Sequence, residues 1–153
     1  MPTAPLKIAM LGLRGIDENL SGGVESHVAE LSARLAVRGH KVTVFCRSGY
    51  VTGDPGEYRG VRRVIVPAVH TKHLEAMSHT LCAMPAVLRG FDIVHFHGMG
   101  PSLLSWAPRL FGRRVVATAH GLDFLRAKWG AAARAALRSG AWCLGKCPHE
   151  RIV

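Results

Sequence analysis

Two glycine-rich turns near the start of the chain have the residue types that bind phosphate. They are Gly12-Leu13-Arg14-Gly15 and Ser21-Gly22-Gly23-Val24-Glu25. The apolar run at 7–11 before them predicts a buried strand, and helical spacing follows in Val24, Val28, Leu31 and Leu35. Backbone amides at such a turn point outward with the positive end of the helix dipole, so we expect a receptor for a phosphate or another anion. The glycine spacing matches neither the Walker phosphate-binding loop nor the Gly-x-Gly-x-x-Gly motif of dinucleotide-binding proteins. The alternative to an anion site is that the glycines only allow the chain to turn.

Histidines are the second group of residues that could do chemistry. His95 and His97 alternate along one apolar segment, and His120 follows another. Alternation places His95 and His97 on the same side of a strand, where both face a ligand or one of them only packs. For His120 the alternatives are a ligand contact and a capping or core position. Because these histidines stand on separate segments with no carboxylate at metal-ligand spacing, we expect no metal site.

Composition and charge narrow the class of protein. The 153 residues are enough for one domain with a core and too few for two ordinary ones. Lys and Arg number 20 against 10 acids, and the net charge of +10 favours an anionic partner such as a nucleotide, a phospholipid surface or nucleic acid. The four cysteines form no Cys-x-x-Cys pair, and neither a signal peptide nor a membrane-spanning apolar run is visible. We therefore expect a cytoplasmic protein.

Strands and helices are predicted to alternate. Apolar and β-branched runs predict strands at 7–11, 41–46, 61–66, 92–96, 114–118 and 151–153, with helices between them. This order is typical of an α/β fold with a doubly wound, mainly parallel, Rossmann-like sheet, whose ligands bind beyond the carboxyl ends of the strands. The loops at 12–23, 97–101 and 119–128 fall at those ends, and we expect them along one edge. The polar loop 47–60 is a further candidate to face a substrate.

A helix predicted over 71–89 has an apolar stripe of Leu74, Met77, Leu81, Met84 and Leu88. We expect Pro85 to kink or divide it. Core packing explains such a stripe. The alternative is contact with an anionic membrane surface, in which the stripe would be joined by Lys72, His73, His79 and Arg89.

Several segments together resemble the N-terminal domain of a retaining glycosyltransferase of family 4, a class with the two-domain GT-B fold. They are Gly22-Gly23-Val24-Glu25, Leu35-x-x-Arg38-Gly39-His40-x-Val42-Thr43-Val44, Asp92-Ile93-Val94-His95-Phe96-His97-Gly98 and Val116-x-Thr118-x-His120-Gly121-Leu122-Asp123. Through Lys72-His73-Leu74-Glu75 and Arg126-Ala127-Lys128-Trp129-Gly130 the chain is similar to bacterial polysaccharide-assembly enzymes often named rhamnosyltransferases. The resemblance covers nearly the whole chain.

The resemblance implies a nucleotide-diphosphate sugar as donor and a saccharide acceptor, commonly lipid-linked, with neither a cofactor nor a metal. Gly22, Gly23 and Val24 match the loop that approaches the donor phosphates, and His120 matches the histidine near the reacting carbon. The resemblance also implies substrate contacts from His97, Gly98, Asp123, Arg126 and Lys128. The resemblance further implies that the protein acts in the cytoplasm, at the inner face of the cytoplasmic membrane.

The resemblance also implies a second, nucleotide-binding domain, and nothing in residues 1–153 corresponds to it. We therefore expect this chain to be the acceptor-side half, cut off as a strand begins, and inactive alone.

Two other classes remain open at this stage. A dinucleotide-binding oxidoreductase shares the strand, glycine turn and helix. Its second strand would end here in Cys46-Arg47 rather than in an acid, so Arg47 would have to accept a ribose 2′-phosphate. A basic module that binds nucleic acid fits the net charge. However, the cations are scattered, without a helix-turn-helix pattern or an aromatic run, so we expect no specific nucleic acid.

Overall fold

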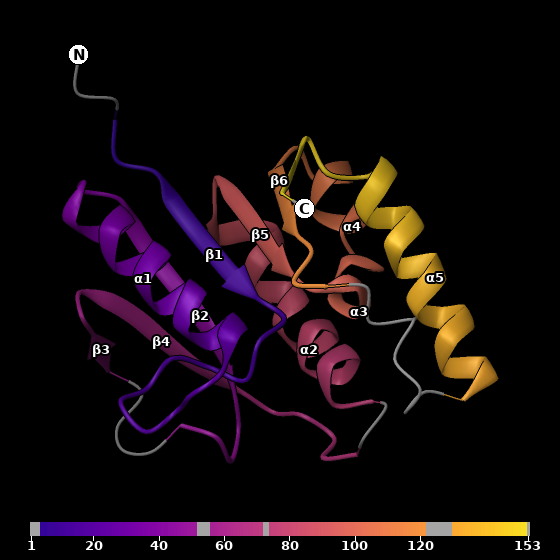
Figure 1. Ribbon diagram of the computed structural model, residues 1–153. Helices are drawn as coiled ribbons and strands as arrows, with labels where there is room; N and C mark the ends of the chain where they lie inside the picture. The colour runs from indigo at the N-terminus through magenta and orange to yellow at the C-terminus, as the bar shows by residue number, and fades with distance from the viewer. Residues whose placement is uncertain (1–3, 52–55, 72–73, 122–129, 153) are drawn as a thin grey trace.

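The computed structural model describes residues 4–51, 56–71, 74–121 and 130–152. Figure 1 shows a single twisted sheet with helices on both faces, and its strand order is β3-β4-β2-β1-β5-β6-β7. The strands are β1 Lys7–Leu11, β2 Lys41–Arg47, β3 Glu57–Tyr58, β4 Val61–Val66, β5 Ile93–His97, β6 Arg114–Thr118 and β7 Glu150–Ile152. All neighbouring pairs are parallel except β3 with β4. The predicted fold class is therefore confirmed.

The helices connect successive parallel strands. They are α1 Gly23–Val37, α2 Glu75–Gly90, α3 Met99–Ser102, α4 Trp106–Leu110 and α5 Ala131–Lys146. β1 lies in the centre of the sheet, between β2 and β5, so the loop after β1 and the loop after β5 are neighbours at the carboxyl edge. This is where the strand order reverses, the position at which doubly wound sheets bind ligands.

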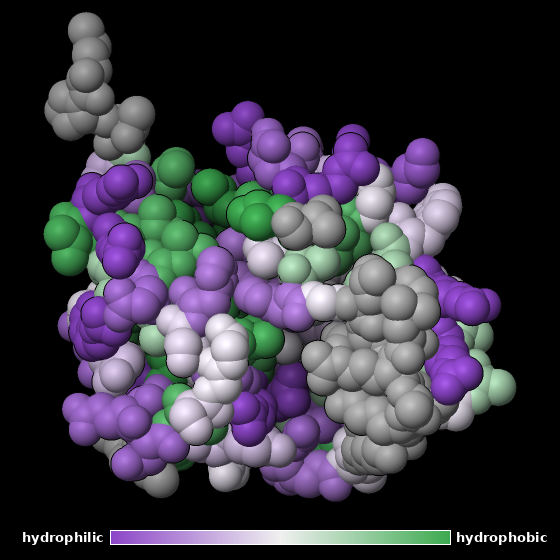
Figure 2. Space-filling view, in the orientation of Figure 1, coloured by the Kyte–Doolittle hydropathy of each residue, from purple (hydrophilic) through white to green (hydrophobic). Residues whose placement is uncertain are grey.

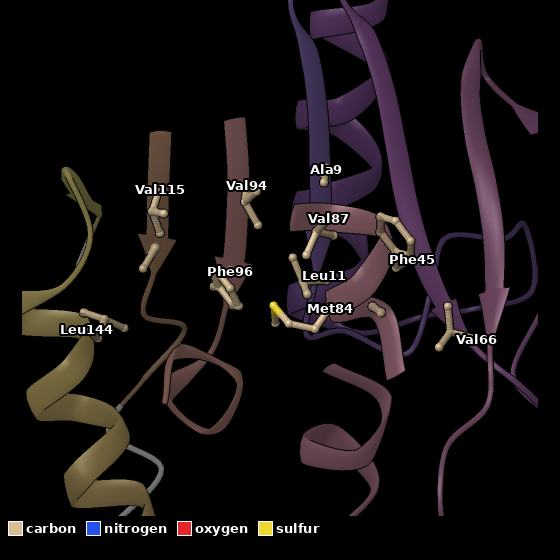
Figure 3. Close-up of a cluster of buried hydrophobic side chains, with 12 residues drawn as sticks. Ala9, Leu11, Phe45, Val66, Met84, Val87, Val94, Phe96, Val115 and Leu144 are labelled. Carbon is tan, nitrogen blue, oxygen red and sulfur yellow. The ribbon is translucent and has the colours of Figure 1, made fainter. Parts of the chain in front are cut away.

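Alternating side chains of the central strands form a core on each face of the sheet. Ala9 and Leu11 of β1 pack on the α2 face together with Phe96, whereas Ile8 and Met10 pack on the α1 face. Figure 3 shows the first of these clusters between the strands and α2. Both faces of β1 are covered, which explains why its sequence is a continuous apolar run. The outer surface on the α1 side is mixed, with hydrophobic areas among hydrophilic ones (Figure 2).

Helix α2 shows how two expectations turned out. Of the two effects predicted for Pro85, division is excluded, because the helix runs through Pro85, which is on its exposed side. The apolar stripe is also not one buried face, because Leu74 and Leu81 are exposed while Met84 is buried. The buried face of the helix is formed by His79, Thr80, Ala83, Met84 and Val87.

The segment after β5 forms two short helices, α3 and α4, where one helix was predicted after a loop. A turn with i to i+3 hydrogen bonds joins them, including Leu104 N to Pro101 O at 3.1 Å. Pro108 has no N–H to give to the carbonyl of Leu104, so one hydrogen bond of a continuous helix is missing between α3 and α4. The predicted polar loop 47–60 likewise contains the short strand β3. Within the described residues, no helix is long and apolar enough to cross a membrane.

Candidate functional site

A cavity of about 790 Å³ opens at the carboxyl ends of the strands. Its walls are residues 12–14, 24–25, 74–77, 97–101 and 130–133, with contributions from Arg47, Leu103, His120, Ala136 and Leu137. The loops after β1, β5 and β6 thus meet at one edge of the sheet, as the sequence predicts. Of the predicted loop 119–128, residues 122–129 lie outside the described part of the chain.

Imidazole rings form one wall of the cavity. His97 Nδ1 lies 3.1 Å from His120 Nε2, so one of these nitrogens donates a hydrogen bond to the other. The ring of His27, from α1, meets the His120 ring edge-on with 5.2 Å between centroids. His95 contacts His97 from behind and pairs its Nε2 with Thr118 Oγ1 at 2.7 Å. His95 therefore supports the wall and does not line the cavity, the packing alternative that the sequence left open.

Burial keeps the inner histidines neutral. Burial, with His27 and His120 nearby, lowers the pKa of His95 from 6.5 to about 4. Burial and the neighbouring imidazoles also lower the pKa of His97 well below its usual value. The Nε2 atom of His97 is buried and has no hydrogen-bond partner among the described residues. A neutral His97 can pass one hydrogen bond to His120 and so fix the orientation of that ring.

The start of α1, where the sequence predicts an anion receptor, also carries a buried carboxylate. Glu25, in the first helical turn, is buried and accepts a hydrogen bond from Arg14 Nε at 2.9 Å. Burial raises the pKa of Glu25, but the bonds from Arg14 and from its own amide outweigh this, and the net pKa is lowered. A Cβ on Gly22 would meet the ends of the Glu25 and Arg14 side chains, which would have to shift to make room for it. A carboxylate therefore already stands at the helix start where a free anion was expected.

A second polar cluster faces the cavity from the other side, and the sequence analysis did not identify it as a site. Glu75, at the start of α2, accepts hydrogen bonds from Arg47 Nη1 at 3.1 Å and from the Tyr50 hydroxyl at 3.1 Å. His70 Nδ1 lies 2.9 Å from the other carboxylate oxygen. We call Arg47, Tyr50, His70 and Glu75 the Glu75 cluster. The hydrogen bonds of these groups outweigh the effect of burial and lower the pKa of Glu75, so it is a carboxylate at neutral pH.

The Glu75 cluster also holds the first glycine turn. Arg47 Nη2 donates to the carbonyl of Gly12 at 3.0 Å. Gly12 has φ of +104°, and a Cβ there would collide with the carbonyl of His97. The β1 turn is therefore fixed between Arg47 on one side and the end of β5 on the other. The sequence contained one indication of this cluster, because a charged residue, Arg47, stands at the end of an apolar strand.

The predicted site residues are only partly brought together. Val24, His97, Gly98 and His120 line the cavity, whereas Gly22 and Gly23 lie beside it without lining it. Three predicted substrate contacts, Asp123, Arg126 and Lys128, lie outside the described residues, as do Lys72 and His73. No group of three or more His, Cys, Asp or Glu in the described segments is placed to hold a metal.

Comparison with known proteins assigns the chain to a family. The model of Glycosyltransferase Family 4 matches residues 21–149, and the chain belongs to this family. A search of curated proteins found no match. Among solved structures, HepE (Alr3699) from Anabaena, crystallised in complex with UDP, is similar with a TM-score of 0.57 at 11% identity. The match covers 95% of this chain and 37% of HepE, and at this identity it shows the shared fold, that of a Rossmann-like half of the GT-B class.

Proposed function

We propose that this chain is the acceptor-side half of a retaining glycosyltransferase that uses a nucleotide-diphosphate sugar. Family membership supports the reaction class, and the structure of HepE, a protein of the same fold, contains UDP. The acceptor in this proposal is a lipid-linked saccharide. The resemblance of residues 72–75 and 126–130 to bacterial polysaccharide-assembly enzymes supports this class of acceptor.

The observation that carries the proposal is the His97–His120 pair in the wall of the cavity. Glycosyl transfer passes through an oxocarbenium-like transition state, and fixed dipoles near the reacting carbon stabilise it without reorganising. In this proposal His120 is the fixed dipole that stabilises the transition state near the reacting carbon. Neutral His97 is a positioning residue, since its hydrogen bond orients the His120 ring while adding no positive charge beside the developing cation.

The other end of the same cavity suits an acceptor. The Glu75 carboxylate lines the cavity here and can accept the hydrogen bonds that sugar hydroxyls donate, while Arg47 holds this carboxylate in place. The lining of the cavity also includes apolar residues, among them Met77, Met99 and Leu103. A sugar bound at Glu75 would thus present one hydroxyl toward the His97–His120 wall.

The proposal also requires a second domain that holds the nucleotide. The chain spans 37% of HepE, and only one wall of a donor cleft would come from residues 1–153. Orientation of donor against acceptor supplies much of the rate in such a reaction, so half a cleft loses most of it.

The test compares residues 1–153 alone with a protein extended by a second Rossmann-like domain. Each is assayed for transfer of labelled sugar from a nucleotide-sugar panel to lipid-linked saccharides. We expect transfer only by the extended protein. Robust transfer by the short chain would contradict the half-cleft argument.

The oxidoreductase alternative receives no support from the position of Arg47. This side chain is buried, pairs with Glu75 and holds the Gly12 carbonyl, so it is not presented to a ribose 2′-phosphate.

A further inference from the structure

The side chain of Tyr50 contacts two charged groups of the cavity wall and does not line the cavity itself. Its hydroxyl donates a hydrogen bond to Glu75 Oε2 at 3.1 Å. Its ring faces the guanidinium of Arg14, whose Cζ is 5.8 Å from the ring centroid, within the range of a cation–π contact. Among the described residues, Arg14 and Glu75 line the cavity and Tyr50 does not. Tyr50 therefore acts on the cavity through these two neighbours.

Arg14 connects the Tyr50 ring to the start of α1. Arg14 Nε lies 2.9 Å from Glu25 Oε1, and Nη2 donates to the carbonyl of Ser21 at 3.1 Å. We call residues 21–24 the donor loop, because the resemblance matches them to the loop near the donor phosphates. The Tyr50 ring is a third partner of the same guanidinium, whose planar, delocalised charge suits an aromatic face. The ring thereby supports the donor loop through Arg14.

The hydroxyl of Tyr50 connects the same side chain to the acceptor end of the cavity. Glu75 is a carboxylate at neutral pH, so the phenol is the donor in their hydrogen bond. Arg47 binds the same oxygen, Oε2, at 3.1 Å, and His70 Nδ1 lies 2.9 Å from Oε1. The carboxylate is thus fixed at both oxygens. Loss of the hydroxyl would remove one of the two donors on Oε2 and leave the carboxylate less well oriented for a sugar hydroxyl.

We propose that Tyr50 is a positioning residue that couples the acceptor end of the cavity to the donor loop. The inference rests on the proposed function and deepens it, because one side chain orients groups for both substrates. Tyr50 belongs to the polar loop 47–60, which the sequence predicts as a candidate to face a substrate. Its two parts have separate tasks: the hydroxyl holds the Glu75 carboxylate, and the ring holds Arg14. Removal of the hydroxyl alone should therefore affect one substrate only.

The kinetic test uses the extended protein with two substitutions of Tyr50, and it measures KM for donor and acceptor separately. Tyr50→Phe removes the hydroxyl and keeps the ring beside Arg14. We expect the acceptor KM to rise about fivefold, because Glu75 loses one of its donors, while the donor KM stays that of wild type. Tyr50→Leu also removes the ring, so the acceptor KM should rise equally and the donor KM should rise about threefold.

Tyr58 supplies the matched control. Its ring faces the guanidinium of Arg63 with the same 5.8 Å between Cζ and the centroid, and neither of these residues lines the cavity. Tyr58→Phe and Tyr58→Leu should leave both KM values unchanged. Thermal unfolding checks that every variant is folded, which separates a loss of positioning from a loss of the fold.

A titration of the 153-residue chain tests the contact without any sugar transfer. The hydrogen bond to Glu75 and burial raise the pKa of Tyr50 above its usual value, and the charges of Arg47 and Arg14 offset only part of this. The chain has only two tyrosines, so in Tyr58→Phe the absorbance change on phenol ionisation reports Tyr50 alone. Adding Glu75→Gln should lower the pKa of Tyr50, whereas adding Glu30→Gln should not.

Four results would overturn the proposal. They are an unchanged acceptor KM in Tyr50→Phe, equal changes of both KM values in the two Tyr50 variants, equal effects of the Tyr50 and Tyr58 variants, and a pKa of Tyr50 that does not fall with Glu75→Gln. Absence of transfer by the extended wild type would contradict the proposed function and, with it, the substrate assignments. The titration would then still report the Tyr50–Glu75 contact, so the two failures are distinguishable.

Discussion

Replacing His79 by leucine should make the protein more stable and less sensitive to acid. His79 is fully buried on the inner face of α2, and neither ring nitrogen makes a hydrogen bond within the described residues. Burial, with the charge of Arg47 acting in the same direction, lowers its pKa from 6.5 to about 4, and nearby carbonyls of Phe45 and Cys46 offset only part of this. Leucine fills a similar volume without polar atoms. We expect the free energy of unfolding at neutral pH to rise by about 1–3 kcal/mol.

The pH dependence of the free energy of unfolding gives a more specific value for the effect of His79. The folded pKa of His79 is depressed, so its contribution to stability is present above the unfolded value of 6.5 and is lost as pH falls toward about 4. Between about pH 7 and about pH 5 this single group accounts for a loss of about 2 kcal/mol. His79→Leu should therefore lose about 2 kcal/mol less than wild type over that interval, since all other titrating groups are shared.

Urea unfolding at both pH values measures this difference. His79→Met is the companion variant, because it repeats the loss of polarity with a different shape. Equal losses of stability in wild type and both variants on acidification would refute the reasoning that His79 is held neutral by burial.

Two further changes test the packing and the charges around the cavity. Gly140→Ala should destabilise the protein by about 2 kcal/mol or more, because its Cβ would collide with the carbonyl of Met99, whereas Gly145→Ala in the same helix meets no atom and should be neutral or stabilising. Thermal unfolding measures both, and equal effects would contradict the close contact of α5 with α3. Glu75→Gln should cost about 1–3 kcal/mol in urea unfolding, because it weakens bonds to a buried guanidinium. Glu30→Gln, in an exposed pair, should change stability by less than about 1 kcal/mol, and the reverse order would contradict our view of the cluster.

The strands of this protein could be predicted closely because each carries its own local signal. Residues 7–11, 61–66 and 114–118 have the predicted bounds, since continuous apolar or β-branched runs between turn residues specify them without help from distant segments. Parallel pairing then follows from the alternation with helices, and it brings the loops after β1, β5 and β6 to one edge.

The Glu75 cluster could not be predicted in the same way. Arg47 and Glu75 are 28 residues apart, and only the packing of α2 against the sheet brings them together. The pairing of Glu25 with Arg14 could not be predicted locally either, because it joins the loop after β1 to a helix that begins several residues later. The break between α3 and α4 did have a local contribution, because Pro108 removes one helical hydrogen bond.

The assay that most directly tests the central claim is donor-dependent sugar transfer by the extended protein carrying His120→Ala. The control is His149→Ala, which removes a histidine at the opposite edge of the sheet, with folding of both variants checked by thermal unfolding. We expect His120→Ala to reduce kcat by about 100-fold or more, because the transition state loses its fixed partner, while His149→Ala retains transfer. Transfer by His120→Ala at the rate of the control would contradict the assignment of this cavity as the site of glycosyl transfer.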